Sequence, residues 1–197
     1  MVLKRCFDIV FSFIGLILLL PILLVISLVI ALDSKGSIFF VQKRVGKNNK
    51  DFRIVKFRTM FGGSQEKGLL TIGDRDSRVT RVGVFLRKYK LDELPQLFNV
   101  LNGTMSLVGP RPELRNFVEA YPTEYIKVLS VKPGITDLAS IAFRNEAELL
   151  KQQKHPEKYY LSVILPKKLI LHKDYINTRS FLTDLKIIFK TFFAILK

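Results

Sequence analysis

Two adjacent carboxylates, Asp92 and Glu93, have the residue type and the placement to do chemistry in this 197-residue sequence. They lie near the start of the stretch 91–101 (LDELPQLFNVL), in which apolar residues recur at helical spacing, and Asn102 and Gly103 follow as a stop signal. The pattern predicts a helix of about two to three turns with both carboxylates in its first turn. The free N–H groups and the dipole at a helix start favour carboxylate over carboxylic acid and attract phosphate. An ionised carboxylate beside a bound phosphate can be a nucleophile, although acidic residues in a first turn are also ordinary helix capping.

A second candidate is Arg111, which stands between Pro110 and Pro112 just after the short apolar strand predicted at 106–108. The two prolines fix the backbone on both sides, which lowers the entropy lost when the guanidinium clamps an oxyanion in a fork. We therefore predict that Arg111 binds phosphate. An ordinary rigid turn with an exposed arginine is the alternative.

Other basic side chains lie on the elements that would position the dyad. Alternating patterns predict a β-hairpin from strands 38–45 and 52–57, with Lys56 and Arg58 on or beside the second strand. Both are candidate substrate-binding residues, although basic residues on an edge hairpin are usually solvated or face lipid headgroups. The segment 79–89 predicts a basic helix that carries Arg87 and leads into the dyad, after a polar, glycine-bearing loop at 66–77.

Composition narrows the partners to anionic ones. Lys and Arg number 32 against 17 Asp and Glu, for a formal net charge of +15. Nucleic acid, acidic lipid and phosphate-bearing small molecules all qualify, but no nucleic-acid-binding signature is present, so no nucleic-acid partner is expected. A single cysteine excludes an internal disulfide, and the two histidines, His155 and His172, have no ligand-spaced neighbours and are predicted at the surface.

The N-terminal region predicts a retained membrane segment. No charged residue occurs from Ile9 to Leu32, which as a helix would be roughly 36 Å long, enough to cross a bilayer. Basic residues flank both ends of this run, with Lys4 and Arg5 before it, so the positive-inside tendency draws both ends to the cytoplasm. Pro21 near the middle would bend the helix. We expect a re-entrant hairpin rather than a transmembrane span, with Asp8 paired to Arg5 at its start or exposed at the interface.

The expected fold is therefore α+β and mostly helical. Residues 1–34 would form a re-entrant helix–break–helix anchor, and residues 35–197 a small cytosolic catalytic domain with a short hairpin or sheet and interfacial amphipathic helices. Short helices are predicted at 113–121 and 123–131, and a further one from Arg144 to 153. The segment 181–197 predicts an aromatic helix that lies in the membrane interface or, alternatively, packs on the core. Apolar helices of this kind could contact lipid or a second subunit, so a homodimer is also open.

Several short motifs occur in a fixed order along almost the whole chain. They are 4–8 (KRCFD), 42–46 (QKRVG), 56–60 (KFRTM), 91–102 (LDELPQLFNVLN), 109–112 (GPRP) and 132–136 (KPGIT). With this ordered set the sequence resembles the bacterial sugar transferases known as monotopic phosphoglycosyl transferases.

The resemblance implies a bacterial inner-membrane enzyme whose catalytic domain lies on the cytoplasmic face. Such enzymes move a phospho-sugar from a UDP-sugar to polyprenyl phosphate and release UMP at the start of surface glycan assembly. It implies Asp92 as the nucleophile of a covalent phospho-sugar intermediate, Glu93 as its helper and Mg²⁺ near Asp92. It also implies substrate contacts from Arg87, Arg111 and Arg144, and the break of a re-entrant helix at Pro21.

The sequence departs from the family pattern near the expected sugar pocket. Leu20 replaces a common serine before Pro21, and Asp137, Ser140 and Phe143 stand where the family often has Gly, Gln and Gly. The stretch 155–168 looks inserted. These differences leave the sugar undetermined and make Arg144 the weakest of the candidate site residues. Two alternatives to the implied reaction are a membrane glycosyltransferase that releases UDP and a non-catalytic membrane module that recruits other enzymes.

Overall fold

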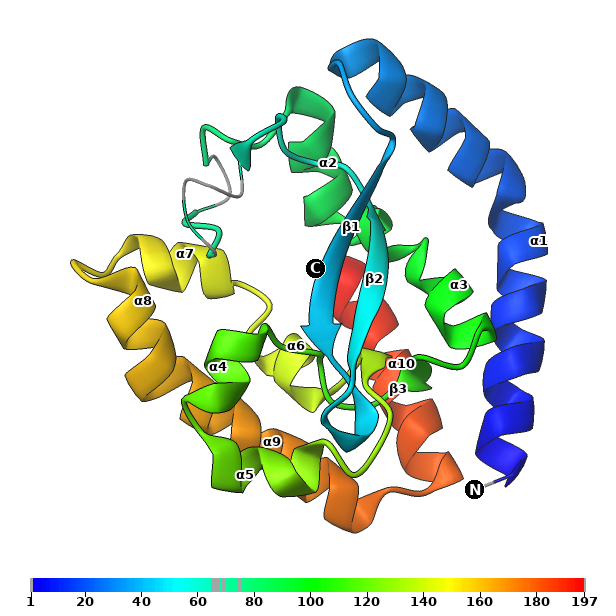
Figure 1. Cartoon of the computed structure of the whole chain (residues 1–197). Helices are drawn as coiled ribbons and strands as arrows, with labels where there is room; N and C mark the ends of the chain where they lie inside the picture. The colour runs from blue at the N-terminus through cyan, green and yellow to red at the C-terminus, as the bar shows by residue number, and fades with distance from the viewer. Residues whose placement is uncertain (1, 65–67, 69, 74–75, 197) are drawn as a thin grey trace.

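The computed structural model describes residues 2–64, 68, 70–73 and 76–196, and within them the predicted mostly helical α+β fold is confirmed. A long helix, α1, lies along one side of a central β-hairpin with α3 between them, and α4, α5, α7 and α8 lie on the other side of the hairpin (Figure 1). The strands are β1 (Phe39–Val45), β2 (Asp51–Phe57), β3 (Ser106–Val108) and β4 (Gly134–Thr136). The helices are α1 (Val2–Asp33), α2 (Arg81–Lys88), α3 (Gln96–Leu101), α4 (Arg115–Glu119), α5 (Pro122–Val128), α6 (Leu138–Ala142), α7 (Glu146–Lys151), α8 (Pro156–Tyr159), α9 (Leu165–Thr178) and α10 (Phe181–Leu196). Short 3-10 turns occupy η1 (Lys47–Asn49) and η3 (Leu91–Glu93), and η4 (Tyr160–Ile164) is a π-helical turn between α8 and α9.

Helix α1 is long and apolar enough to cross a membrane by length and composition. Its most apolar 18-residue window has a mean hydropathy of 3.2 and is only 17% buried. The helix is continuous through Pro21, and Figure 1 shows it curving along its length. The buried side chains Leu16, Leu23, Ile26 and Ile30 pack against the domain, so the helix is docked along one stripe and bare elsewhere. The expected break at Pro21 is therefore wrong for the described helix, whereas a re-entrant course through the bilayer stays a prediction.

The first turns of α1 are tied to the domain by polar side chains. Arg5 donates to the last carbonyls of α3, at 2.6 Å to Val100 O and 3.0 Å to Leu101 O, which suits a cation at a helix C-terminus. The buried Asp8 carboxylate accepts from Ser106 Oγ at 2.8 Å and from the Leu107 amide at 3.1 Å. The expected Asp8–Arg5 pair is therefore wrong, because each side chain satisfies a neighbouring element instead.

Lys4 ties the N-terminus to the last helix. Its ammonium donates to Val108 O at 3.0 Å and pairs with the buried Asp184 of α10. Together with Arg5 and Asp8, it gives the basic N-terminal flank a structural role in the fold.

The hairpin forms as predicted, within a residue or so at each end. β1 and β2 pair antiparallel in the register Val41↔Val55, and Val45↔Asp51 closes the pairing next to the turn. The turn contains Asn48 and Asn49 with φ of 58° and 60°, a left-handed conformation that asparagine tolerates. The predicted loop 66–77 lies in part outside the described residues, and the described part of it contains no helix or strand.

A second, parallel sheet was not predicted in full. β3 was expected, but no strand was predicted at its partner β4, because three residues are too few to give a periodic signal. The two strands are joined through a close approach of Gly109 and Gly134. A Cβ added at Gly134 would lie 2.1 Å from the Gly109 nitrogen, so only glycine fits there.

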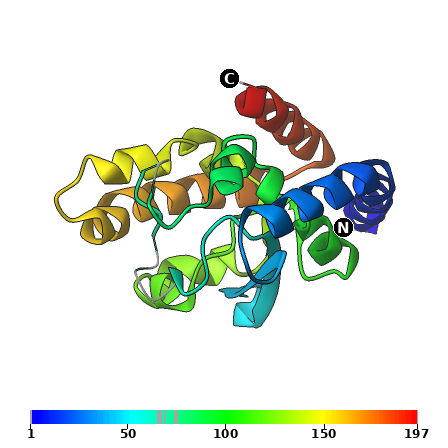
Figure 2. The ribbon, with the colours of Figure 1, turned by 90° about the horizontal axis from the view of Figure 1, so that it is seen from above.

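The helical side of the molecule carries the largest apolar cluster, built around Phe117, Tyr125, Tyr160 and Leu165. Helix α10 forms where it was predicted and shows two faces. Ile187 is 1% exposed and packs with β3 and α9. Three phenylalanines away from this face are more than half exposed, namely Phe189, Phe192 and Phe193. Figure 2 shows the C-terminal half of α10 extending away from the other helices.

Candidate active site

The dyad lies in η3, a tight turn that precedes α3. Lys90 takes a left-handed φ of 55° just before it, and Pro95 is the N-cap of α3. The expected single helix over 91–101 is thus wrong, since the chain forms a 3-10 turn up to Pro95, which has no N–H to continue a helical ladder. Gly103, with φ of 86°, provides the expected left-handed stop. The carboxylates are brought together in sequence as predicted but are more enclosed, at 8% exposure for Asp92 and 7% for Glu93.

Glu93 is held by two cations from distant parts of the chain. Lys56 Nζ lies 2.9 Å from Oε1, and Arg111 approaches with a fork, Nη2 at 2.6 Å from Oε1 and Nη1 at 3.3 Å from Oε2. Burial would raise the pKa of Glu93, but Arg111 and Lys56 outweigh it and hold the pKa well below its usual range. The charge of Glu93 in turn raises the pKa of Arg111. Glu93 is therefore an ionised, fixed group.

Asp92 has the opposite surroundings. Its Oδ1 is buried, and none of the described residues donates a hydrogen bond to it. Burial raises the pKa of Asp92, and the neighbouring charge of Glu93 adds to this, against the smaller effects of Lys56, Lys90 and Arg87. We expected the helix start to favour ionisation of both carboxylates. The pKa of Glu93 is lowered, but by Arg111 and Lys56, and the pKa of Asp92 is raised instead. Asp92 is left with an oxygen free to bind or react.

Arg87 is near enough to the dyad to interact with its charge. Its guanidinium donates to Thr59 Oγ1 at 2.8 Å and to Thr71 Oγ1 at 3.1 Å. Burial lowers the pKa of Arg87, and Asp92 opposes that shift. The structure therefore places Arg87, Lys56 and Arg111 together with the dyad, as the sequence predicted.

Two other predicted substrate-binding residues lie elsewhere. Arg58 is buried and caps the end of α1, with Nη2 at 2.6 Å from Ser34 O and 3.3 Å from Ile30 O. Arg144 reaches the last turn of α10, with Nη2 at 3.4 Å from Ile195 O. Both use their charge at a helix C-terminus, so the structure supports a positioning role for them in the fold rather than a contact with the dyad.

Behind Arg111, a buried polar network continues that the sequence analysis missed. Glu113 accepts from Tyr160 Oη at 2.8 Å and lies 3.5 Å from Arg44 Nη1, and Arg44 also donates to Pro112 O at 3.2 Å. Glu113 is 5% exposed. Arg44 lies within the motif 42–46 and Glu113 follows the motif 109–112, but Tyr160, which donates to Glu113, is 47 residues away from it, so no local signal could pair them.

A buried carboxylate, Asp137, is a further residue that sequence reasoning did not place. It lies 1% exposed, and its Oδ2 is 2.6 Å from Nε2 of His172, which is also 1% exposed. The predicted surface position of His172 is therefore wrong, whereas His155 is exposed as predicted. His172 lacked a partner in the sequence because Asp137 comes from another element.

The residues around Asp92 fit a magnesium ion. The described residues contain no group of three or more metal-ligating side chains. Mg²⁺ does not need one, because it commonly takes one or two protein carboxylates and completes its shell with water and substrate phosphate. Asp92 with its unpartnered Oδ1 suits this pattern, while Glu93 is already occupied by Lys56 and Arg111.

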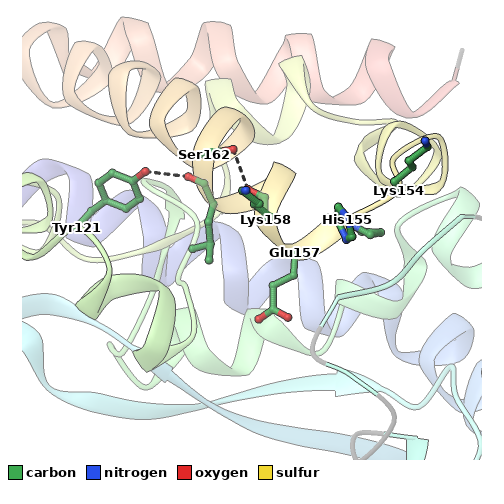
Figure 3. A pocket seen from close by; sticks show the side chains of 8 residues that line it. Tyr121, Lys154, His155, Glu157, Lys158 and Ser162 are labelled. Atoms are coloured by element: carbon green, nitrogen blue, oxygen red, sulfur yellow. Dashed lines mark hydrogen bonds between the residues drawn. The ribbon is translucent and has the colours of Figure 1, made fainter.

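A surface hollow of ≈ 810 Å³ lies apart from the dyad, over α8 and η4 (Figure 3). Its wall includes Tyr121, whose hydroxyl donates to Leu161 O, and Ser162, whose hydroxyl donates to Lys158 O. Neither Asp92 nor Glu93 lines this hollow, nor do the basic residues that surround them. It is therefore not part of the candidate active site.

The structure thus combines a buried acidic dyad, cations that surround it and a helix long and apolar enough to cross a membrane. The sequence matches the bacterial sugar transferase family over residues 1–197. The chain therefore belongs to this family.

The names of three similar proteins describe their roles in more detail. The chain is 42% identical over 197 residues to the UDP-glucose:undecaprenyl-phosphate glucose-1-phosphate transferase of Klebsiella pneumoniae, covering 98% of the chain and 40% of the relative. It is 48% identical over 141 residues to the UDP-N-acetylgalactosamine-undecaprenyl-phosphate N-acetylgalactosaminephosphotransferase of Aeromonas hydrophila, covering 70% of the chain and 33% of the relative. It is 33% identical to the exopolysaccharide production protein ExoY of Rhizobium meliloti (strain 1021), covering 98% of the chain and 84% of the relative. The chain thus spans less than half the length of the first two.

Proposed function

We propose that this protein transfers a sugar 1-phosphate from a UDP-sugar to polyprenyl phosphate and releases UMP. The observation that carries the proposal is the contrast within the dyad, where Glu93 is fixed by two cations and Asp92 keeps an unpartnered oxygen. The names of the relatives support the same reaction, since they describe sugar-phosphate transfer from UDP-sugars to undecaprenyl phosphate. The polysaccharide role of ExoY supports a place at the first membrane step of surface glycan assembly.

Asp92 is the proposed nucleophile. Its carboxylate oxygen attacks the sugar-bearing phosphorus, a P–O bond to Asp92 forms, and the P–O bond to UMP breaks with departure of UMP. An oxygen of polyprenyl phosphate then attacks the same phosphorus, and the carboxylate leaves as it was. Burial destabilises the ionised carboxylate, so bond formation, which removes that charge, relieves an unfavourable state.

The cations prepare the site for the negative charge of the diphosphate. Glu93 holds Arg111 and Lys56 in place. The planar guanidinium of Arg111 presents two parallel N–H donors, a geometry that also suits phosphate oxygens. Arg87, on α2, adds a further cation whose charge interacts with that of Asp92. A magnesium ion on Asp92 would neutralise phosphate charge when bound. Most of the expected rate gain is thus positioning and electrostatic stabilisation.

Membrane association follows from the lipid substrate. The bare apolar surface of α1 and the exposed phenylalanines of α10 would place the site near headgroup height, on the cytoplasmic side of the bacterial inner membrane. A re-entrant α1 predicts that cysteines placed at position 2 and near Lys35 label from the same side. Labelling from opposite sides would establish a transmembrane span.

The reaction is tested by the nucleotide product. Detergent-solubilised protein would be given Mg²⁺, polyprenyl phosphate and either UDP-glucose or UDP-N-acetylgalactosamine, and the nucleotide released would be measured for the wild type and Asp92→Asn. UMP from the wild type and not from Asp92→Asn supports the proposal. UDP in place of UMP would indicate a glycosyltransferase, and release of neither nucleotide would favour a non-catalytic module.

A further inference from the structure

The turn that carries Arg111 has a single backbone donor between its two prolines. Pro110 and Pro112 have no N–H, so the Arg111 amide is the one backbone hydrogen-bond donor of residues 110–112. The carbonyl of Pro110 accepts from the Gly134 amide at 3.0 Å, and that of Pro112 accepts from Arg44 at 3.2 Å. How the Arg111 amide is held therefore decides how firmly the turn is fixed.

The partner of that amide is the side chain of Asp137. Its Oδ2 accepts from Arg111 N at 3.1 Å and lies 2.6 Å from His172 Nε2, while its Oδ1 accepts from Ser140 N at 2.6 Å. One carboxylate thus joins the Arg111 turn, the start of α6 and the middle of α9. Capping of α6 uses Oδ1 alone, so the two contacts of Oδ2 serve a different purpose.

From this geometry we propose that Asp137 and His172 are positioning residues that hold the Arg111 turn, so that the guanidinium meets Glu93 and the substrate phosphates. The proposal deepens the proposed function and rests on it for its kinetic consequence. His172 Nε2 lies 2.6 Å from Oδ2, and this close contact between two buried side chains keeps Oδ2 where it accepts from the Arg111 amide. Neither residue touches the reacting atoms.

The charge of Asp137 makes the contact stronger than a neutral hydrogen bond. Burial would raise the pKa of Asp137, but His172 and Ser140 favour the carboxylate and lower the pKa to about 2. The Arg111 amide therefore donates to an anion at any working pH, and the bond is charge-assisted. Asp137 is 1% exposed, so little water reaches the acceptor side of this bond.

The direct test is hydrogen exchange of the Arg111 amide in the full-length protein in detergent. Asp137→Asn is compared with the wild type by mass spectrometry on peptides that span 108–113. Asparagine keeps the shape but has one acceptor oxygen for the amides of Arg111 and Ser140, which bond different oxygens of Asp137, so we expect about tenfold faster exchange at Arg111, as for loss of one net hydrogen bond. Asp184→Asn is the matched control, since Asp184 is a buried carboxylate that accepts from Lys4 and Tyr175.

Variants of His172 separate positioning from folding and leave Asp137 in place. His172→Gln keeps an N–H donor near Oδ2 and should retain slow exchange, whereas His172→Phe should lose it. Faster exchange at Arg111 in Asp184→Asn to the same extent as in Asp137→Asn would overturn the proposal. So would equal exchange in His172→Gln and His172→Phe.

Kinetics give the functional half of the test. Asp137→Asn and His172→Phe should raise the KM for the UDP-sugar severalfold with a smaller change in kcat, because a loosened Arg111 binds the charged substrate less well. His172→Gln should restore KM. An unchanged KM in folded Asp137→Asn would refute the positioning role. If the wild type turned over no UDP-sugar, the proposed function would fail, while the exchange result would still decide whether the pair holds the turn.

Discussion

The two sides of the η3 turn differ in what they do to a carboxylate. On one side, Glu93 meets Lys56 and Arg111, which lie within hydrogen-bond distance and keep it ionised. On the other side, Asp92 is as deeply buried, but its Oδ1 has no donor among the described residues, and its pKa is raised. Two neighbouring acids of similar chemistry thus have different surroundings, which suit Glu93 as a fixed anion and Asp92 as the proposed nucleophile.

The largest expected effect concerns activity and the reactive side. Asp92→Asn keeps the shape of the side chain and removes the nucleophilic charge, so we expect turnover to fall by on the order of 10³ or more. The measurement is UMP release under saturating UDP-sugar. A variant with near wild-type turnover would remove the distinction between the two sides.

The next effect concerns stability and the fixed side. Glu93→Gln leaves Lys56 and Arg111 without their anion, and loss of one partner of a buried pair costs about 3 kcal/mol. Chemical denaturation would report it. Glu124→Gln is the control, because Glu124 pairs with Lys173 at the surface, where an ion pair contributes less than about 1 kcal/mol. Equal effects of the two substitutions would contradict the assignment of Glu93.

The geometry of the fork gives a third prediction. Arg111→Lys retains the charge but not the two parallel N–H donors, and hydrogen bonds to charged groups contribute about 1.5–3 kcal/mol, so kcat/KM should fall roughly ten- to hundredfold. Arg115→Lys provides the control, since Arg115 bonds Asp51 and Asn49 at an exposed site. A fall of the same size in both variants would argue against a special role for the fork.

The smallest effect is a difference in pH dependence. Because the folded-state pKa of Asp92 is raised, its ionisation costs stability above that pKa, and Asp92→Asn should raise Tm at neutral pH by about 2–4 °C for each kcal/mol regained. Below the unfolded-state pKa near 4 the two proteins should converge. Glu93 has a lowered pKa, so its contribution is present above its unfolded-state pKa and is lost on acidification. Thermal scans between about pH 3 and pH 7 would show Tm differences of opposite sign for Asp92→Asn and Glu93→Gln.

Local patterns predicted those parts of the site that neighbouring residues determine. The dyad, the strand that carries Lys56, the helix that carries Arg87 and the proline-flanked Arg111 each have a local signal. The prediction of one helix over 91–101 was wrong at Pro95, because proline has no N–H to continue the helical hydrogen bonds. Arg58 and Arg144 were assigned to the site by their charge and by resemblance, but each instead meets the carbonyls at a helix end.

Long-range contacts could not be read from the sequence. Asp137 lies 26 residues from Arg111, and its pairing with His172 needs α9 to return to the turn. The link between Tyr160 and Glu113 is of the same kind. Such contacts depend on tertiary packing, which periodicity and spacing do not encode. One of them, between Asp137 and the Arg111 amide, is the contact that we propose fixes Arg111, so the sequence missed the proposed support of the site.

The most direct test of the central claim is to find the covalent intermediate. Protein mixed with Mg²⁺ and a UDP-sugar but no polyprenyl phosphate would be quenched rapidly, digested and analysed by mass spectrometry. The account predicts a phospho-sugar adduct on the peptide that contains Asp92, lost on addition of polyprenyl phosphate and absent from Asp92→Asn. An adduct on another residue, or undiminished UMP release by Asp92→Asn, would contradict it.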